Sequence, residues 1–154
     1  MSLLLEPYTL RQLTLLNRIA VSPMCQYSSV DGLANDWHLV HLGSRAVGGA
    51  GLVFTEATAV TADGRITAQD LGLWNDEKIE PLQRITLFIA AQGAVAGIQL
   101  AHAGRKASTH RPWLGNHGSV KPEDGGWVPV GPSTIAFDPQ HTHPRQLDES
   151  EIAE

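Results

Sequence analysis

Polar residues that can bind or react follow three separate apolar runs of this sequence. Cys25 and Tyr27 come directly after the first run. Glu56 lies within the second, and Gln99 and His102 close the third. If the runs are parallel strands, their carboxyl ends meet at one rim, where α/β proteins gather their working residues. The pattern predicts a binding site at strand ends, although Glu56 and Gln99 could equally be satisfied polar groups of the core.

The segments that would position these groups alternate between strand-like and helix-like patterns. Each apolar run is rich in β-branched residues, and Pro23 ends the first because proline cannot donate to a sheet. Such alternation is typical of parallel β/α units. The expected strands span 18–24, 51–60 and 94–104. The expected helices span 37–47, stopped by Gly48 and Gly49, and a segment capped by Asn75 or Asp76 that runs to Gln92.

A long segment without regular periodicity, 104–147, follows the third run. A connection of this length inside a domain is unusual unless it is functional, so we expect an active-site excursion with short strands such as Trp127–Val130. Asp148 and Glu151 then form a capping pattern that begins a helix just before the sequence stops. Three parallel strands with raw edges and this unfinished helix indicate part of a larger domain.

The histidines admit a metal-binding interpretation and a structural one. His38 and His41 are three residues apart on the first expected helix, but neither an HExxH motif nor a suitably spaced carboxylate accompanies them. We therefore favour packing or capping roles and expect no metal site. His141 and His143 are expected to belong to a solvated loop.

Two other features also have alternative interpretations. Cys25 could be a buried small hydrophobe rather than a reactive thiol, although its place after a strand favours a functional role. Arg105 and Lys106 follow the third run and could hold an anion or simply be surface charge.

Composition excludes several classes of protein. The 154 residues include 16 acidic residues, 11 Lys and Arg, and one Cys, for a net charge of −5. We therefore expect no nucleic-acid partner and no internal disulfide. No apolar stretch approaches the 18 or so residues of a membrane span, and the GGAG at 48–51 precedes a strand, unlike a dinucleotide fingerprint. We expect a soluble, cytoplasmic protein without membrane contact.

Long segments of the sequence resemble the old yellow enzyme family of flavin-dependent ene-reductases. Cys25 is similar to the cysteine of the thermophilic-like subclass, and GRKAS followed by RPW resembles the xenobiotic-reductase type. The similarity runs in order through NRIAVSPMCQYS (17–28), NDWHLVHLGSRAVGGAGLVFTEATAV (35–60), GRIT (64–67) and IQLAHAGRKAS (98–108).

The resemblance implies a (β/α)8 TIM barrel with FMN at its C-terminal mouth. Such a barrel needs about 250 residues. Residues 1–154 would then be the N-terminal segment of one barrel domain, with about three β/α units and a long loop after strand three. The segment would be truncated at the start of a helix near 148–154.

The resemblance also assigns roles to residues of the rim. The thiol of Cys25 would tune the flavin, Ala57 would leave room beneath the ring, and Gln99 would bind the pyrimidine edge. The implied FMN contacts are Ser22, Pro23, Met24, Cys25, Ala57 and Gln99, and the implied substrate contact is Tyr27.

The implied reaction passes hydride from NADPH or NADH to FMN, and then to the C=C bond of an α,β-unsaturated carbonyl compound. The family's carbonyl-polarising pair follows strand four, so no catalytic residue is expected in this chain, and we expect it to be inactive alone. The expected partners are a small enone and the complementary C-terminal part of the barrel, with a possible homo-oligomer when complete. The sequence leaves open a fragment, half of a split enzyme, or a non-catalytic flavin-binding module.

Overall fold

The computed structural model describes residues 2–152, and its centre is a small parallel sheet. Strand β4 (Leu52–Ala59) pairs along one edge with β6 (Val95–Ala101). Along its other edge it pairs first with β3 (Ala20–Val21) and then, near its end, with β5 (Leu71–Gly72). All of these pairings are parallel, which confirms the expected α/β architecture.

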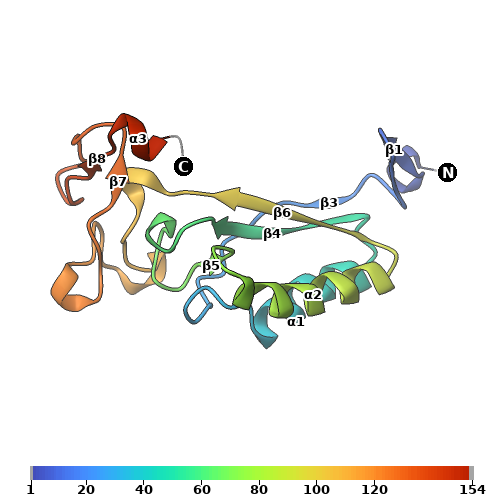
Figure 1. Ribbon diagram of the computed structural model, residues 1–154. Helices are drawn as coiled ribbons and strands as arrows, with labels where there is room; N and C mark the ends of the chain where they lie inside the picture. The colour runs from blue at the N-terminus through green and yellow to red at the C-terminus, as the bar shows by residue number, and fades with distance from the viewer. Residues whose placement is uncertain (1, 153–154) are drawn as a thin grey trace.

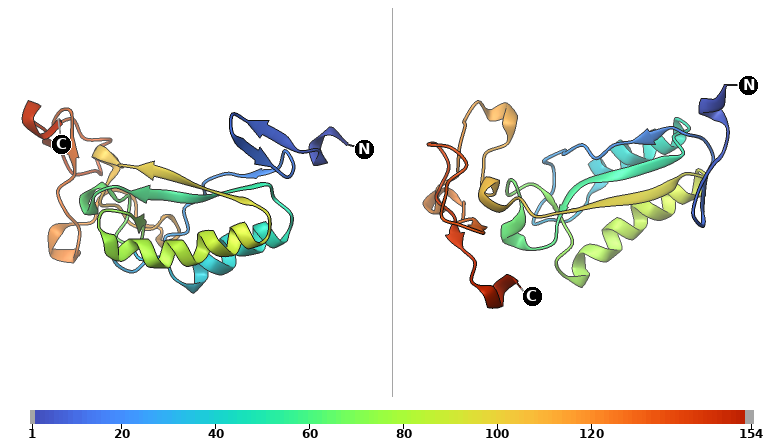
Figure 2. Two further views of the ribbon diagram at one scale, coloured as in Figure 1. Left: turned by 45° about the vertical axis from the view of Figure 1, so that its right-hand side comes forward. Right: turned by 90° about the horizontal axis from the view of Figure 1, so that it is seen from above.

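Two helices cover one face of this sheet, as Figures 1 and 2 show: α1 (Asp36–Val47) and α2 (Ile79–Ala91). The Asn35 side chain accepts from the N–H of Trp37, so α1 begins with a capped end. A 3-10 turn precedes α2, and Pro81 lies in the first turn, where a missing N–H breaks no helical bond. The core between helices and sheet is made by Leu42, Ala46, Val53, Leu71, Leu82, Ile85 and Ile89.

The middle of β4 contains a register shift between Phe54 and Ala57. Before the shift, Val53 belongs to the core beneath the helices, and Phe54 on the other face lies across Gly97. After the shift, Glu56 contacts His38 of α1 on the face that the helices cover, and Ala57 lies on the same face of the sheet as Phe54. Because side chains alternate along a strand, an extra residue of this kind reverses which positions face which side.

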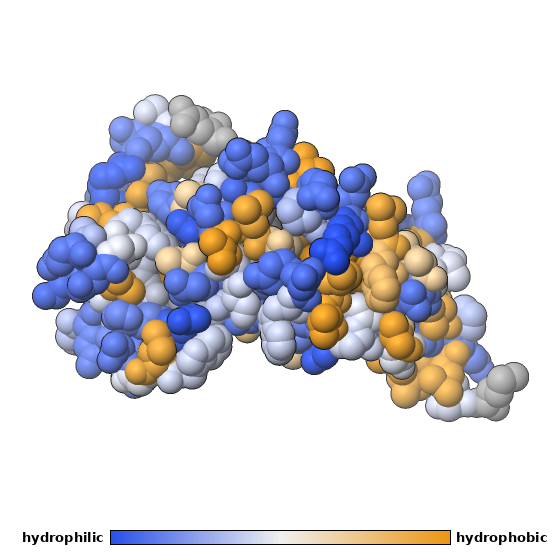
Figure 3. All heavy atoms as spheres, turned by 90° about the horizontal axis from the view of Figure 1, so that it is seen from below, coloured by the Kyte–Doolittle hydropathy of each residue, from blue (hydrophilic) through white to orange (hydrophobic). Residues whose placement is uncertain are grey.

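The two ends of the sheet carry different structures. At the amino end of the strands, β1 (Tyr8–Leu10) and β2 (Leu13–Leu15) form an antiparallel hairpin (Figure 1). Apolar side chains gather around the N-terminus in Figure 3, where Leu3–Leu5, Leu10 and Leu13 are exposed. Sequence reasoning did not predict this hairpin because each of its strands has only three residues.

Beyond the carboxyl ends of the strands lies the expected excursion, 104–147 (Figure 1). It contains three 3-10 turns and a short parallel pair, β7 (Val130–Gly131) and β8 (Arg145–Gln146). The helix expected near 148–154 begins as α3 (Glu149–Ile152), and its last two positions lie outside the described residues.

Strand β3 is much shorter than the sequence predicts. The run 18–24 was expected to be one strand, but only Ala20 and Val21 pair, with Leu52 and Val53. The chain then leaves β4 two residues before Pro23 and crosses toward the rim. Among residues 2–152, no helix has the length and apolar character needed to cross a bilayer.

Candidate functional site

The sheet register places two of the expected cofactor residues side by side. Gln99 of β6 is the direct pairing partner of Ala57 in β4, with its side chain exposed and that of Ala57 half-buried. A pocket of about 260 Å³ opens beside them at the carboxyl ends of both strands. It is lined by Ala57, Ala59, Gly64, Ile66, Asp70, Gln99, Leu100, Ala101, His102 and Ala103.

The loop after β3 brings Cys25 to the same place. Its half-buried thiol lies close to the backbone of Ala57. Burial raises the pKa of this thiol, Asp70 and Glu56 raise it further, and the hydrogen bond from the Ala57 backbone acts against the shift. Cys25 is therefore predominantly a neutral thiol near pH 7, able to donate a hydrogen bond to a neighbouring acceptor.

Tyr27 lies beside Cys25 on a strained piece of backbone. Its φ is +49°, in the left-handed region that non-glycine residues rarely adopt. Its ring meets the ring of Trp113 edge to face at 5.6 Å, so the excursion contacts the rim here. Partial burial, followed by the thiol of Cys25 and the charge of Asp70, raises the pKa of Tyr27 to about 12. The phenol remains a proton donor across the physiological range.

The remaining expected cofactor residues, Ser22, Pro23 and Met24, connect β3 to Cys25. The side chains of Ser22 and Met24 are exposed, and Pro23 is half-buried. The Met24 carbonyl accepts from the Gln26 side chain at 2.8 Å, which shapes the turn before Tyr27. The segment is therefore accessible along the rim.

Sequence reasoning missed a buried contact between a histidine and a carboxylate beneath this rim. His38 Nε2 lies 2.9 Å from Glu56 Oε1, with the two side chains 1% and 3% exposed. The other oxygen, Oε2, accepts from the backbone N–H of Gln26 at 2.5 Å. The capping role favoured for His38 is confirmed, since its Nδ1 accepts from the Asn35 N–H at 3.1 Å. Glu56 is therefore a buried polar group of the core whose Oε2 is hydrogen-bonded, whereas its Oε1 makes no hydrogen bond among the described residues and has only the imidazole contact.

Asp70 is a second buried carboxylate that the sequence did not single out. It accepts from the N–H groups of Ile66 and Thr67 and from the Thr67 hydroxyl, closing the turn before β5. Burial raises its pKa, and these hydrogen bonds oppose the shift. An Asp three residues after a Thr in GRITAQD is the signal that could have identified this turn.

Arg65 connects the excursion to the loop between β4 and β5. Its guanidinium lies 5.1 Å from the ring centres of both Trp74 and Trp127 and donates to the carbonyls of Ala62 and Ala68. This clamp holds Trp127 and the chain around it against the sheet end.

The other polar residues of the excursion have local roles. His102 Nδ1 accepts from the Gly104 N–H, and Lys106 lies over the ring of Phe137 at 4.3 Å. The expectation that His141 belongs to a solvated loop is wrong: it is 11% exposed and lies 2.7 Å from Asp138 Oδ1. His143 is exposed, as expected. Across residues 2–152, no three His, Cys, Asp or Glu side chains are arranged to hold a metal.

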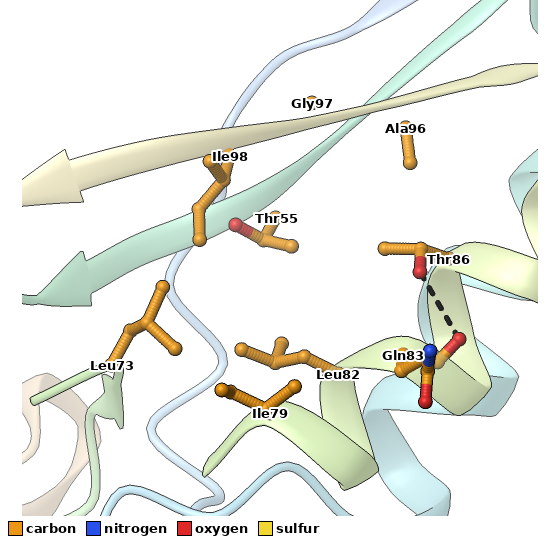
Figure 4. Close-up of a pocket in the computed structure, with 9 residues that line it drawn as sticks. All are labelled: Thr55, Leu73, Ile79, Leu82, Gln83, Thr86, Ala96, Gly97 and Ile98. Atoms are coloured by element: carbon orange, nitrogen blue, oxygen red, sulfur yellow. Dashed lines mark hydrogen bonds between the residues drawn. The ribbon is translucent and has the colours of Figure 1, made fainter. Parts of the chain in front are cut away.

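A second pocket, of about 420 Å³, lies away from the rim, on the side of the sheet that the helices cover (Figure 4). Ile79 and Leu82 of α2 point into it from one side, and Thr55, Ala96 and Ile98 from the sheet. Its lining is largely apolar and holds no ionisable group. It is therefore a packing surface rather than a place for chemistry.

Comparison with known proteins agrees with the rim geometry. Residues 3–154 match the model of the NADH:flavin oxidoreductase / NADH oxidase family. The chain belongs to this family. The old yellow enzyme resemblance is thereby confirmed, and with it the flavin and nicotinamide cofactors that the family name states.

Two similar proteins are oxidoreductases longer than this chain. An NADH:flavin oxidoreductase of Gibberella zeae is 54% identical over 132 residues, which are 84% of this chain and 32% of that protein. An NADPH dehydrogenase of Bacillus cytotoxicus is 46% identical over 151 residues, 97% of this chain and 39% of that protein. The chain thus spans about two fifths or less of the relatives it matches.

Solved structures show the same fold. Morphinone reductase superposes with a TM-score of 0.80 at 23% identity, covering 97% of this chain and 41% of that one. Morphinone reductase in complex with tetrahydroNAD superposes with a TM-score of 0.76 at 26% identity. The old yellow enzyme homologue from Zymomonas mobilis gives 0.76 at 24%. The expected N-terminal part of a TIM barrel is confirmed.

Proposed function

We propose that this chain is the flavin-binding N-terminal segment of an NAD(P)H-dependent ene-reductase that reduces the C=C bond of α,β-unsaturated carbonyl compounds. The observation that supports it most is the meeting of Cys25, Ala57 and Gln99 at the ends of three strands. They arrive there through separate elements that share one rim. Cys25, Ala57 and Gln99 would hold FMN, which would supply hydride transfer between NADPH or NADH and the substrate.

The residues present fit a flat, partly polar cofactor. Ala57 has only a methyl group facing the pocket, which leaves space for a ring above it. The exposed amide of Gln99 can both donate to and accept from a pyrimidine edge. The neutral thiol of Cys25 can donate a hydrogen bond, and Ser22, Pro23 and Met24 supply backbone along the same rim.

Tyr27 is proposed to line the substrate side of this site. Its phenol stays protonated at working pH because its pKa is raised to about 12. It can therefore donate a hydrogen bond to a carbonyl oxygen, and Trp113 supports its ring from the excursion. No residue among those described supplies the paired carbonyl-polarising groups that the resemblance implies, so we propose that the chain alone does not turn over.

The complementary part of the barrel is the proposed partner. The apolar pocket beside α2 lies at the open edge of β6, where a further β/α unit would cover Leu82 and Ile98 (Figure 4). We propose that residues 1–154 form one segment of a single domain, continued by the strands and helices that close this edge.

Two assays test the proposal. The 154-residue chain should show no NADPH oxidation with 2-cyclohexenone, and mixing it with the complementary part of a relative should produce a flavin absorption band near 450 nm that co-elutes with protein. Turnover by the chain alone would contradict the proposed inactivity. Tight FMN binding without turnover, unchanged by the partner, would instead favour a non-catalytic flavin-binding module.

A further inference from the structure

One buried carboxylate joins three elements directly beneath the rim. Glu56 belongs to β4, its Oε1 faces His38 Nε2 of α1 at 2.9 Å, and its Oε2 accepts from the Gln26 N–H at 2.5 Å. Gln26 lies between Cys25 and Tyr27 in the chain. The backbone that presents those two side chains is therefore attached to the sheet through Glu56.

The imidazole of His38 links Asn35 on one side to Glu56 on the other. Its Nδ1 lies 3.1 Å from the Asn35 backbone nitrogen and 2.9 Å from the Asn35 side-chain oxygen. Its Nε2 faces Glu56 Oε1 at 2.9 Å and lies 3.4 Å from the Ser29 hydroxyl. Among the described residues, Glu56 Oε1 makes no hydrogen bond, and the imidazole at 2.9 Å is its polar contact. Burying a carboxylate that is only 3% exposed is costly, so the hydrogen bond to Oε2 and this contact both matter for holding Glu56 in place.

The attached backbone is one that needs support. Tyr27 has a φ of +49°, and an aromatic residue holds that conformation only where its surroundings impose it. The bond from the preceding Gln26 N–H to Glu56 fixes the peptide group on one side of this residue. On the other side, the Ser29 N–H donates to the Gln69 carbonyl at 2.9 Å.

We propose that Glu56 is a positioning residue, which, with His38 holding its second oxygen, fixes the backbone that presents Cys25 and Tyr27 at the rim. The value of that placement for catalysis rests on the proposed function above. The placement itself requires no flavin, so the two can be tested separately.

Cys25 is the only cysteine of the chain, and its alkylation therefore reports on this loop alone. The experiment compares wild type with Glu56→Ala and Glu56→Gln. It measures the pH profile of iodoacetamide labelling and the hydrogen exchange of the Gln26 amide. Glu80→Gln is the matched control, since it removes one exposed negative charge from α2. Far-UV circular dichroism verifies that each variant is folded.

Glu56→Ala should accelerate Gln26 exchange by about ten- to a hundredfold, the effect of losing a hydrogen bond to a charged acceptor. It should also raise the labelling rate of the fully ionised thiol, because the loop becomes more accessible. Glu56→Gln keeps an oxygen that can accept from Gln26, so exchange should stay near wild type. Its labelling midpoint should move to lower pH, because the Glu56 charge raises the pKa of Cys25.

Wild-type rates of Gln26 exchange and Cys25 labelling in a folded Glu56→Ala protein would overturn the proposal. So would a Glu56→Gln variant that accelerates Gln26 exchange as much as Glu56→Ala does. If Glu56→Ala does not fold, Glu56→Asp takes its place. It keeps the charge but shortens the side chain, so exchange at Gln26 must still accelerate, and an unchanged rate would refute the role. Flavin retention, measured in parallel, tests the proposed function independently of these results.

Discussion

Arg65 should contribute far more to stability than an ordinary surface arginine. Its guanidinium contacts two indole rings at 5.1 Å and donates to the Ala62 and Ala68 carbonyls at 2.7 and 3.1 Å. A cation–π contact contributes about 0.5–1 kcal/mol when exposed and about 2 kcal/mol when desolvated. Each hydrogen bond from a charged donor adds about 1.5–3 kcal/mol, less what the freed carbonyls regain from water.

Because these terms overlap, we expect Arg65→Ala to lower the free energy of unfolding by about 2–4 kcal/mol. Arg65→Lys should cost about half as much, because an ammonium keeps the charge but lacks the planar fork that reaches two carbonyls at once. Urea denaturation followed by tryptophan fluorescence measures both. Hydrogen exchange at the Trp127 amide, which donates to Ser108 Oγ at 2.7 Å, shows whether the excursion loosens locally.

The matched control is Arg84→Ala. Arg84 also makes a 2.8 Å contact, with Asp36, but the two side chains are 58% and 82% exposed, so its loss should cost less than about 1 kcal/mol. If Arg65→Ala and Arg84→Ala destabilise equally, or if Trp127 exchange is unchanged in Arg65→Ala, the clamp does not hold the excursion and the reasoning fails.

Three further outcomes follow from other contacts. Gly97→Ala should cost about 1–3 kcal/mol in urea denaturation, because its new methyl group would lie 2.6 Å from the Phe54 ring; full stability would show that the ring moves aside freely. Tyr27 should titrate near pH 12 when its ionisation is followed by ultraviolet absorbance. Because its pKa is raised in the folded chain, its contribution to the free energy of unfolding is present below the ordinary value of 10.0 and is lost as pH rises toward 12. A midpoint near 10 would contradict the burial described. Ala57→Leu should abolish flavin retention by the completed barrel while Ala57→Gly preserves it, and retention by the leucine variant would place the ring elsewhere.

The sequence predicted the repeating units of the fold but not its smallest elements. The helices α1 and α2 and the strands β4 and β6 follow from apolar runs with caps and glycine stops, signals that extend over seven or more residues. The hairpin of β1 and β2 has strands of three residues, and β5 has two, so no periodicity could develop in them. Such elements form because neighbouring structure offers them partners.

The site was predictable in part for a similar reason. Pattern alone placed Cys25 and Gln99 at strand ends, and the family resemblance added Ala57, which as an alanine carries no chemical signal of its own. The contact between His38 and Glu56 was not predictable, because it joins residues 18 positions apart across a register shift. Periodicity without that shift would have placed Glu56 on the opposite face from His38.

The register shift in β4 also bears on how this strand tolerates insertions and deletions. Two residues of β4, Thr55 and Glu56, stand between Phe54 and Ala57, where β6 has only one residue. Deleting one residue at this point would restore simple alternation and leave the faces of the remaining positions unchanged. A deletion in the regularly alternating part of β4 would instead reverse the faces of every position on one side of it. Length variation within this strand is therefore expected among homologues only at the register shift.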